Sequence, residues 1–214
     1  MPKRILKFMP ALKNIIFDLG GIFLNIDFAR TKKAFTELGV TDFDNYFTQH
    51  HANELFELLE TGKISNEEFH NSFVEHTGVP LTYEQVKDAW NALLLDFPPE
   101  RLEWLKKIGK QYKTFLFSNT NKIHHDAFTE SFRQQFGEDF DQYFIKAYYS
   151  HEMGLRKPYP ESFQFILDEQ NLKPEETLFI DDTLKNVEGA KRVGLKTVHL
   201  VPPMTIQNLD LGGF

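Results

Sequence analysis

Polar residues that can do chemistry follow short apolar runs at four points of the sequence. They are Asp18, the pair Ser118-Asn119, Ser150 and the pair Asp181-Asp182. If the apolar runs are parallel strands, their carboxyl ends meet at one edge of a sheet, where ligands bind in open α/β folds. Three carboxylates at this edge would repel one another unless a cation lay between them. The pattern therefore predicts a cation-binding site built from strand ends.

The donor types at this edge favour Mg²⁺, which binds carboxylate, carbonyl and water oxygens in octahedral geometry. Lys157 lies in the loop after the third apolar run and can reach the same edge, while Ser118 and the backbone N–H groups around Asn119 add uncharged donors. Together these groups are typical of phosphoryl transfer, in which catalysis is mostly positioning and charge neutralisation. Each residue alone could be an ordinary turn, cap or loop residue, but their joint order favours a catalytic site.

Apolar runs typical of buried strands must position these polar residues. The predicted strands are Ile15–Phe17, Thr114–Phe117, Ile145–Tyr149, Thr177–Ile180 and Thr197–Val201. Stretches with the apolar spacing of helices lie at Glu100–Ile108, 123–137, Pro160–Leu172 and Leu184–Val193. Strands that alternate with helices imply right-handed crossovers. The predicted fold class is therefore α/β, with a Rossmann-like parallel sheet that has helices on both faces.

An insertion after the first predicted strand interrupts this alternation and shows only helical periodicity. Phe28–Leu38 and Ala52–Leu59 have the apolar spacing of helices, and capping-box patterns at Ser65 and Thr82 open two more. The predicted domains are a core of residues 1–26 and 97–214 and an inserted all-helical domain of residues 27–96.

Two histidine pairs fall in stretches with helical periodicity and have no matching metal ligands. We therefore interpret His50-His51 and His124-His125 as surface or core packing. The tail from Thr205 onward has no pattern that predicts a helix or strand.

Composition narrows the class of protein and its partners. Of the 214 residues, 41% are hydrophobic and 22 are Phe, which can support a sizeable core. The formal net charge of -7 gives no reason to expect nucleic acid or an anionic membrane as partner. The absence of Cys excludes disulfides, thiolate metal sites and cysteine nucleophiles. Lys3, Arg4 and Lys7 begin a segment too interrupted for a signal peptide, and no run has membrane-spanning length. We expect a soluble, cytoplasmic protein; its oligomeric state is not predicted.

With these residues in place, the chain resembles the haloacid dehalogenase-like hydrolases over essentially its full length. Phe17-Asp18-Leu19-Gly20-Gly21 is similar to the first motif of that family, Ser118 matches the second, Lys157 the third, and Asp181-Asp182-x-x-x-Asn186 the fourth. The inserted helices match a cap that follows the first motif in this family. Within the family the chain is most similar to bacterial sugar-phosphate phosphatases, such as the α-D-glucose-1-phosphate phosphatase, which share Asp-Leu-Gly and Ser-Asn-Thr-Asn.

The resemblance implies a Mg²⁺-dependent phosphatase that hydrolyses small phosphomonoesters, in particular sugar phosphates, through an aspartyl-phosphate on Asp18. It implies that Ser118, Asn119 and Lys157 bind the substrate, and that Ser118 and Lys157 also take part in catalysis. The implied metal ligands are the carboxylates of Asp18 and Asp182, the carbonyl of Gly20, and Asp181 directly or through water. Asn186 would orient the groups around these ligands.

One position departs from the family pattern. Phosphatases of this family usually carry a second aspartate two residues after the nucleophile, as general acid and base, and here that position is Gly20. General acid catalysis is worth roughly 10²–10⁴-fold, so another group, a water or a better leaving group must compensate. Asp27 is a candidate only by its proximity in sequence.

Gly20 keeps two alternatives open. A metal-independent dehalogenase also lacks the second aspartate, but it would leave the paired Asp181 and Asp182 as unexplained repulsion. A non-catalytic phosphate-binding protein on the same core would need no acid, although the retained nucleophile, Ser, Lys and Asp pair favour an enzyme. A phosphomutase is disfavoured, because it must return the phosphoryl group through a poised acid–base residue.

Overall fold

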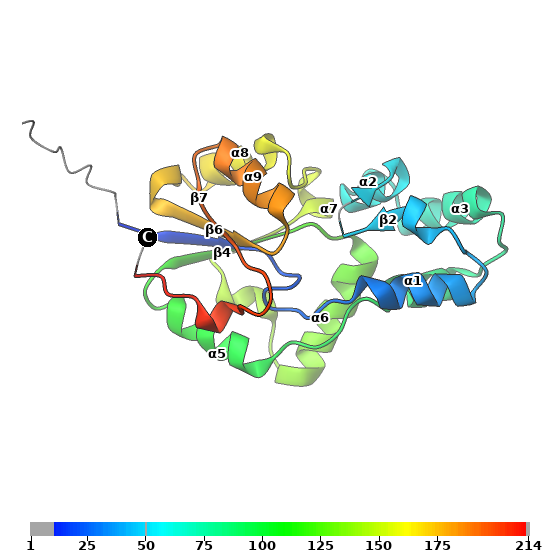
Figure 1. Ribbon diagram of the computed structural model, residues 1–214, viewed down its shortest axis with the longest axis horizontal. Coiled ribbons are helices and arrows are strands. Elements are labelled where there is room, and N and C mark those ends of the chain that lie inside the picture. Colours follow the sequence, from blue (N-terminus) through cyan, green and yellow to red (C-terminus); the bar gives the residue numbers. More distant parts are fainter. Residues whose placement is uncertain (1–10, 50, 213–214) are drawn as a thin grey trace, which may run out of the picture.

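Within the residues that the computed structural model describes, 11–49 and 51–212, five parallel strands form the central sheet (Figure 1). They are β1 (Asn14–Phe17), β4 (Lys113–Ser118), β5 (Lys146–Tyr149), β6 (Thr177–Asp181) and β7 (Lys196–His199). Their order across the sheet is β5-β4-β1-β6-β7, and every neighbouring pair is parallel. Strand β1 is therefore central, with Phe17 paired to both Leu116 and Ile180.

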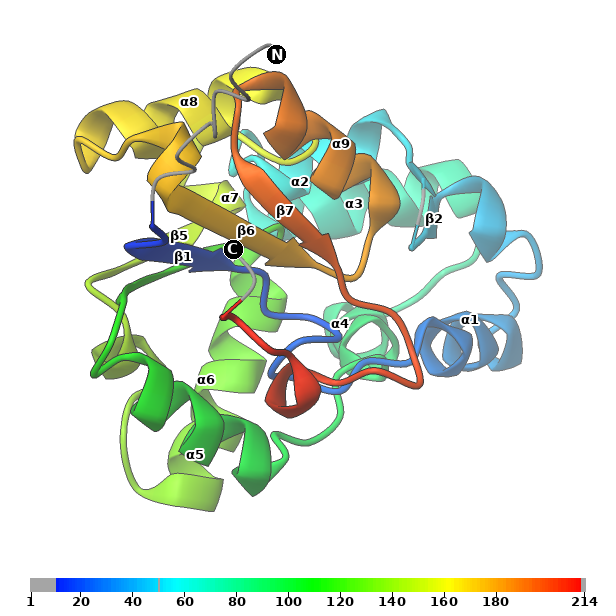
Figure 2. The same cartoon turned by 60° about the vertical axis from the view of Figure 1, so that its left-hand side comes forward.

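Helices cover both faces of this sheet, because successive side chains of each strand point to opposite faces. Ile16 packs with Phe179 and Phe163 on the face covered by α8 (Pro160–Glu169) and α9 (Leu184–Arg192). Ile15 and Phe17 pack on the opposite face, which α5 (Pro99–Ile108) and α6 (Lys122–Phe136) cover (Figure 2). The predicted α/β fold class with helices on both faces is confirmed.

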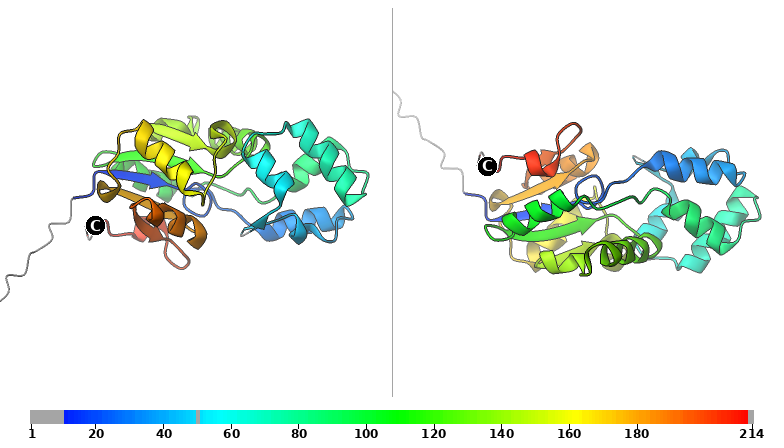
Figure 3. Two further views of the ribbon diagram at one scale, coloured as in Figure 1. Left: turned by 90° about the horizontal axis from the view of Figure 1, so that it is seen from above. Right: turned by 90° about the horizontal axis from the view of Figure 1, so that it is seen from below.

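The inserted segment forms a group of helices beyond the edge of the sheet at which the strands end (Figure 3). These are α1 (Phe28–Glu37), α2 (Glu54–Glu60), α3 (Asn66–Thr77) and α4 (Tyr83–Asn91). Capping boxes open α3 at Ser65 and α4 at Thr82, as predicted. The helices pack around their own aromatic cluster, which contains Phe35, Phe43, Phe56, Phe69, Phe73 and Trp90.

The expectation that this segment is all-helical is wrong at one place. Strands β2 (Phe47–Thr48) and β3 (His51–Ala52) form a short antiparallel hairpin, and α2 begins only at Glu54, with Asn53 as its N-cap. Two-residue strands are too short to produce an alternating pattern, so the sequence does not reveal them. His51 is consequently in a strand and not in a helix, and His50 lies outside the described residues.

The remaining elements are short, and one of them corrects the expectation for the tail. They are α7 (Ser150–Met153) and the 3₁₀ turns η1 (Phe43–Asn45), η2 (Phe140–Tyr143), η3 (Pro174–Glu176) and η4 (Ile206–Asn208). Ile206 in η4 is fully buried against the core and Leu211 is nearly so, so the tail beyond Thr205 is anchored to the core at these two residues. The basic residues Lys3, Arg4 and Lys7 lie outside the described residues. No helix of the part described is long and apolar enough to cross a membrane.

The two chain crossings between the sheet region and the inserted helices lie side by side. The backbone of Asn25 donates to Asp96 and accepts from Leu95, while Asp27 donates to Leu93. The division into a core and a cap at residues 26/27 and 96/97 stays a prediction, and this paired crossing lies where it places the boundary.

Truncation of Phe56 tests whether the aromatic cluster stabilises the inserted helices. The ring is fully buried and contacts the rings of Phe43, Phe47, Phe69, Phe73 and Trp90. We expect Phe56→Ala to lower the free energy of unfolding by about 3–5 kcal/mol in urea denaturation, because it removes buried contacts and leaves a cavity. Phe165→Ala is the matched control, since that ring is 42% exposed. Equal stability of the two variants would contradict this assignment.

Candidate active site

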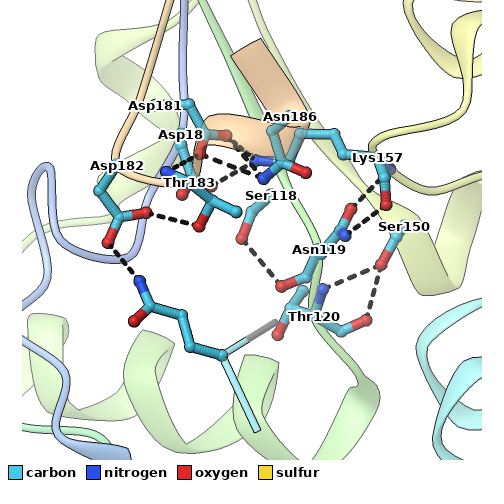
Figure 4. A network of polar contacts seen from close by, with 11 residues as sticks. Asp18, Ser118, Asn119, Thr120, Ser150, Lys157, Asp181, Asp182, Thr183 and Asn186 are labelled. Carbon is cyan, nitrogen blue, oxygen red and sulfur yellow. Dashed lines mark hydrogen bonds and ion pairs between the residues drawn. The ribbon is translucent and has the colours of Figure 1, made fainter. Parts of the chain in front are cut away.

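Two of the predicted strand-end residues, Asp18 and Asp181, meet at the ammonium of Lys157 (Figure 4). Its Nζ lies 2.7 Å from Asp18 Oδ1, at the end of β1, and 2.8 Å from Asp181 Oδ2, at the end of β6. The residue is only 1% exposed. Burial alone lowers the pKa of Lys157, but the two carboxylates outweigh it, so the pKa lies above its usual range. The ammonium is therefore charged and held between two acids.

The Asn119 side chain fixes the backbone of Lys157. Its Nδ2 donates to the Lys157 carbonyl and its Oδ1 accepts from the Lys157 N–H, both at 2.9 Å. Gly189 of α9 lets the same loop pack closely, because a Cβ there would lie 2.1 Å from the carbonyl oxygen of Pro158. The amide of Asn119 is therefore used for positioning, which leaves its backbone N–H as the group that could bind a substrate oxygen.

Ser118 is the last residue of β4, and the loop that follows it carries Asn119 and Thr120. Ser118 is 4% exposed and lines the same cavity as Asp18. Ser150, at the start of α7, holds this loop through the backbone of Thr120. Its hydroxyl accepts from the Thr120 N–H and donates to the Thr120 carbonyl, both at 2.9 Å. The sequence marks Ser150 only as a polar residue at a strand end. In the structure it fixes the backbone of the loop that follows Ser118.

Asp181 is completely buried and has partners on both oxygens. Besides Lys157, it accepts from the Thr183 N–H at 2.7 Å and from Asn186 Nδ2 at 3.1 and 3.0 Å. Asn186 thus lies beside the predicted metal ligands, where it orients Asp181. A buried carboxylate that accepts from this many donors is held in one orientation.

The carboxylate oxygens of Asp18, Asp181 and Asp182 lie within 4.8 Å of one another. Burial raises the pKa of Asp18 and of Asp182 above their usual ranges, and the neighbouring Asp181 raises both further, while Lys157 opposes the effect. Negative charge on these carboxyl groups is therefore unfavourable without a further positive partner. Clustered carboxylates suit a hard cation such as Mg²⁺, so these residues fit the predicted metal.

A cavity of about 380 Å³ opens in front of these carboxylates. Pockets for small ligands typically range from roughly 300 to 1,000 Å³, so it suits a small metabolite. The sheet side contributes Asp18, Gly20, Ser118, Asn119, Lys157, Asp182 and Asn186, and the inserted segment contributes Phe28, Phe47, Thr48, Gln49, His51, Ala52, Glu57 and Glu60. The cavity therefore lies between the two parts of the chain, and Asp181 is placed behind its wall.

Contacts between the two parts of the chain border this cavity, and they leave little sign in the amino-acid sequence. Gln49, after β2, donates from Nε2 to Asp182 Oδ2 at 3.3 Å. Arg156 pairs with Glu57 at 2.5 Å and with the buried Glu60 at 2.8 Å. The available signals were weak, since Arg156 directly precedes Lys157 and the two glutamates lie one helical turn apart, a spacing that usually marks a solvated face.

His124 is a core histidine at this boundary, in line with its interpretation as packing. Its ring stacks on Trp90 of α4, with centroids 4.3 Å apart. Nε2 donates to the Trp90 carbonyl at 3.0 Å, and Nδ1 lies 3.3 Å from Asn121 Nδ2, which fixes the neutral tautomer. Burial lowers the pKa of His124 to about 4.

Asp27, considered as a replacement acid, lies elsewhere. Its Oδ1 accepts from the Ala29 N–H at 2.9 Å and caps α1, and it is not among the residues that line the cavity. The capping role accounts for this aspartate.

Comparison with known proteins places the chain among hydrolases. A family model described as haloacid dehalogenase-like hydrolase matches residues 12–194. The D-ribitol-5-phosphate phosphatase of Bacteroides thetaiotaomicron is 34% identical over 187 residues, which cover 87% of this chain and 90% of that protein.

Solved structures show the same architecture. A HAD family enzyme from Bacteroides thetaiotaomicron, crystallised as a mutant with magnesium and inorganic phosphate, superposes with a TM-score of 0.87 at 31% identity, covering 92% of this chain and 98% of that chain. A HAD-like family hydrolase from Porphyromonas gingivalis superposes with a TM-score of 0.80 at 35% identity, covering 88% and 91% of the two chains.

Gly21 offers a test of the carboxylate cluster as a metal site. Its φ is +71°, and an added Cβ would lie 2.5 Å from Asp182 Oδ2. We expect Gly21→Ala to displace this carboxylate and to weaken Mg²⁺ binding by roughly 10–100-fold in calorimetric titration.

Gly78→Ala is the matched control for this substitution. Gly78 has a similar φ of +66° with nothing within 4 Å of an added Cβ, so it carries the backbone strain alone. Equal Mg²⁺ affinity in the two variants would contradict a role of Asp182 in metal binding.

The lowered pKa of His124 predicts acid sensitivity of the folded state. An ordinary histidine takes up a proton in the unfolded chain below pH 6.5, whereas the folded ring resists until about pH 4, so stability is lost as the pH falls through this window. The loss attributable to His124 is about 3 kcal/mol, from roughly 1.4 kcal/mol for each pKa unit. Denaturation at several pH values should show a shallower decline in His124→Gln than in the parent protein, and the exposed His76→Gln should leave the decline unchanged. An unchanged decline in His124→Gln would show that this ring is not the sensitive group.

Proposed function

The chain belongs to the haloacid dehalogenase-like hydrolase family, and from this premise we propose that it is a Mg²⁺-dependent phosphatase that hydrolyses small phosphomonoesters, in particular sugar or polyol phosphates. The observation that carries the proposal is the ion-pair geometry of Asp18, Lys157 and Asp181 at the floor of a small cavity. The D-ribitol-5-phosphate phosphatase, similar over most of both chains, supports the substrate class.

Asp18 would act as the nucleophile. Its carboxylate attacks phosphorus while the ester bond breaks, and water then hydrolyses the aspartyl-phosphate, so that one difficult displacement becomes two easier ones. Lys157, 2.7 Å from Asp18, lowers the repulsion between this carboxylate and the approaching phosphate. The hydroxyl of Ser118 and the N–H of Asn119 would bind the phosphoryl oxygens as their charge shifts.

The metal would be held by Asp18, Asp182 and the carbonyl of Gly20, with Asp181 binding directly or through water. When bound, Mg²⁺ supplies positive charge that offsets the negative charge of nucleophile and substrate. Because both oxygens of Asp181 already accept from Lys157, Asn186 or Thr183, a contact through water fits its surroundings better.

Residues 27–96 would serve as the cap that closes over the substrate and excludes water. Gln49 and the Glu57–Arg156 pair are contacts of such a closed arrangement, since they join the inserted helices to the sheet side of the cavity. The paired crossings at Asn25 and Leu95 would be the hinge.

Phosphoryl transfer accounts for the acidic cluster better than dehalogenation does. Displacement at carbon by Asp18 requires no cation, and three carboxylates within 4.8 Å of one another would then have Lys157 as their main counter-charge. A phosphate dianion with Mg²⁺ gives each of these groups a partner.

A phosphate-release assay over sugar phosphates, polyol phosphates and nucleotides tests the proposal. We expect turnover with Mg²⁺, none in excess chelator, and a loss of at least ~10³-fold in Asp18→Asn, because an amide is a poor nucleophile. The variant should still bind phosphate, and the parent protein should form a beryllofluoride adduct at Asp18.

Asp168→Asn, at an exposed position on α8, is the matched control and should keep full activity. Retained turnover in Asp18→Asn would overturn the mechanism, and undiminished turnover in chelator would overturn the metal. Phosphate binding without turnover of any ester would favour the non-catalytic alternative.

A further inference from the structure

The chemistry of the proposed reaction requires a proton that Gly20 cannot supply. When Asp18 displaces an alkyl phosphate, the ester oxygen leaves as an alkoxide, and a positioned acid that protonates it accelerates the step by roughly 10²–10⁴-fold. Gly20 has no side chain, and Asp27 is engaged in capping α1 outside the cavity. A donor must therefore come from elsewhere on the cavity wall.

Most ionisable groups of this wall are already engaged. Asp18 and Asp182 belong to the proposed nucleophile and metal site, and Lys157 lies between two carboxylates. Glu57 and Glu60 pair with Arg156. Both ring nitrogens of His124 have partners. Two more, Tyr159 and Lys185, enter from the sheet side. His51 remains, and it comes from the inserted segment, which would face the leaving group when a phosphate lies on Asp18.

The position of His51 suits a proton donor. It lies in β3 directly opposite Thr48, and both residues line the cavity. Gln49, which follows Thr48 in this hairpin, donates to Asp182. The hairpin therefore reaches over the edge of the sheet at which the carboxylates lie. Within the described residues the imidazole has no hydrogen bond or ion pair, and the residue is exposed. Histidine is the side chain whose charge ordinarily changes near neutral pH, which suits transfer of a proton in both directions.

We propose that His51 is the general acid of the reaction and replaces the carboxyl group that position 20 lacks. The inference rests on the proposed phosphatase function. As the bond between Asp18 and phosphorus forms, the bond from phosphorus to the ester oxygen breaks, and the electron pair passes to that oxygen. The oxygen takes the proton of the imidazolium and leaves as a neutral alcohol. The neutral ring then accepts a proton from the water that attacks phosphorus, which restores the imidazolium. The bond from phosphorus to Asp18 breaks, its electron pair returns to the carboxylate, and phosphate is released.

The test compares two esters that differ in their need for a proton. Glycerol 3-phosphate releases a strongly basic alkoxide, whereas p-nitrophenyl phosphate releases a phenolate that is stable without protonation. In His51→Gln we expect kcat/KM to fall by roughly 10²-fold or more for the alkyl ester and by less than about 3-fold for the aryl ester. Across a series of aryl esters, the variant should depend more steeply on leaving-group pKa than the parent protein.

A substitution at an exposed position should leave the fold intact, and equal thermal unfolding temperatures would establish this. Tyr159→Phe is the control, because it alters another ionisable residue of the cavity and should change both esters alike. A loss in His51→Gln that is equal for both esters would show a packing role and overturn the proposal, as would full activity on both. A selective loss in Tyr159→Phe would assign the proton to that phenol instead.

The same assays give a different result if the proposed phosphatase function itself is wrong. In that case the parent protein hydrolyses neither ester with Mg²⁺, and the assignment of His51 falls with it. If the parent protein hydrolyses both esters and the variant does not discriminate between them, only the assignment of His51 is wrong.

Discussion

The rest of the site depends on the two buried ion pairs that Lys157 forms with Asp18 and Asp181. A charge that is removed from water needs partners of opposite charge, and breaking a buried pair costs roughly 3–5 kcal/mol. This requirement ties the end of β1, the end of β6 and the loop after β5 to one point. Asn119 and Gly189 then fix the backbone of that loop, so positioning and charge compensation are achieved by the same few residues.

The sheet side of the site could be predicted because parallel strands have a simple geometry. Apolar runs of three to five residues that alternate with helices are long enough to be recognised, and their carboxyl ends must share an edge. The prediction that Asp18, Asp181 and Lys157 meet there follows from this constraint, and the structure brings them within hydrogen-bonding distance. The α/β class and the capping boxes at Ser65 and Thr82 were accessible for the same reason, since each is encoded locally.

The side of the cavity formed by the inserted segment could not be predicted, because no regular geometry such as that of parallel strands relates its distant residues to the sheet. Arg156 and Glu57 are 99 positions apart, and Gln49 and Asp182 are 133 apart. The hairpin of β2 and β3 has two residues in each strand, which is below the length at which periodicity carries information. The packing of the tail against the core was hidden in a similar way, because its two buried residues, Ile206 and Leu211, lie too far apart to give a periodic signal.

In the proposed function, the contact from Gln49 to Asp182 would link closure of the inserted segment to cation binding at the carboxylates. Any ligand that changes the charge or orientation of this carboxylate alters the free energy of the contact, and therefore the population of the arrangement in which the hairpin lies over the site. Thermodynamic reciprocity requires the converse effect as well. Closing of the hairpin must therefore alter the affinity for that ligand by the same factor. With one hydrogen bond worth about 0.5–1.5 kcal/mol net, or up to about 3 kcal/mol when an acceptor is charged, the coupling amounts to between a few-fold and about a hundred-fold. The sampling of open and closed arrangements would consequently depend on divalent-cation concentration, even in the absence of any substrate.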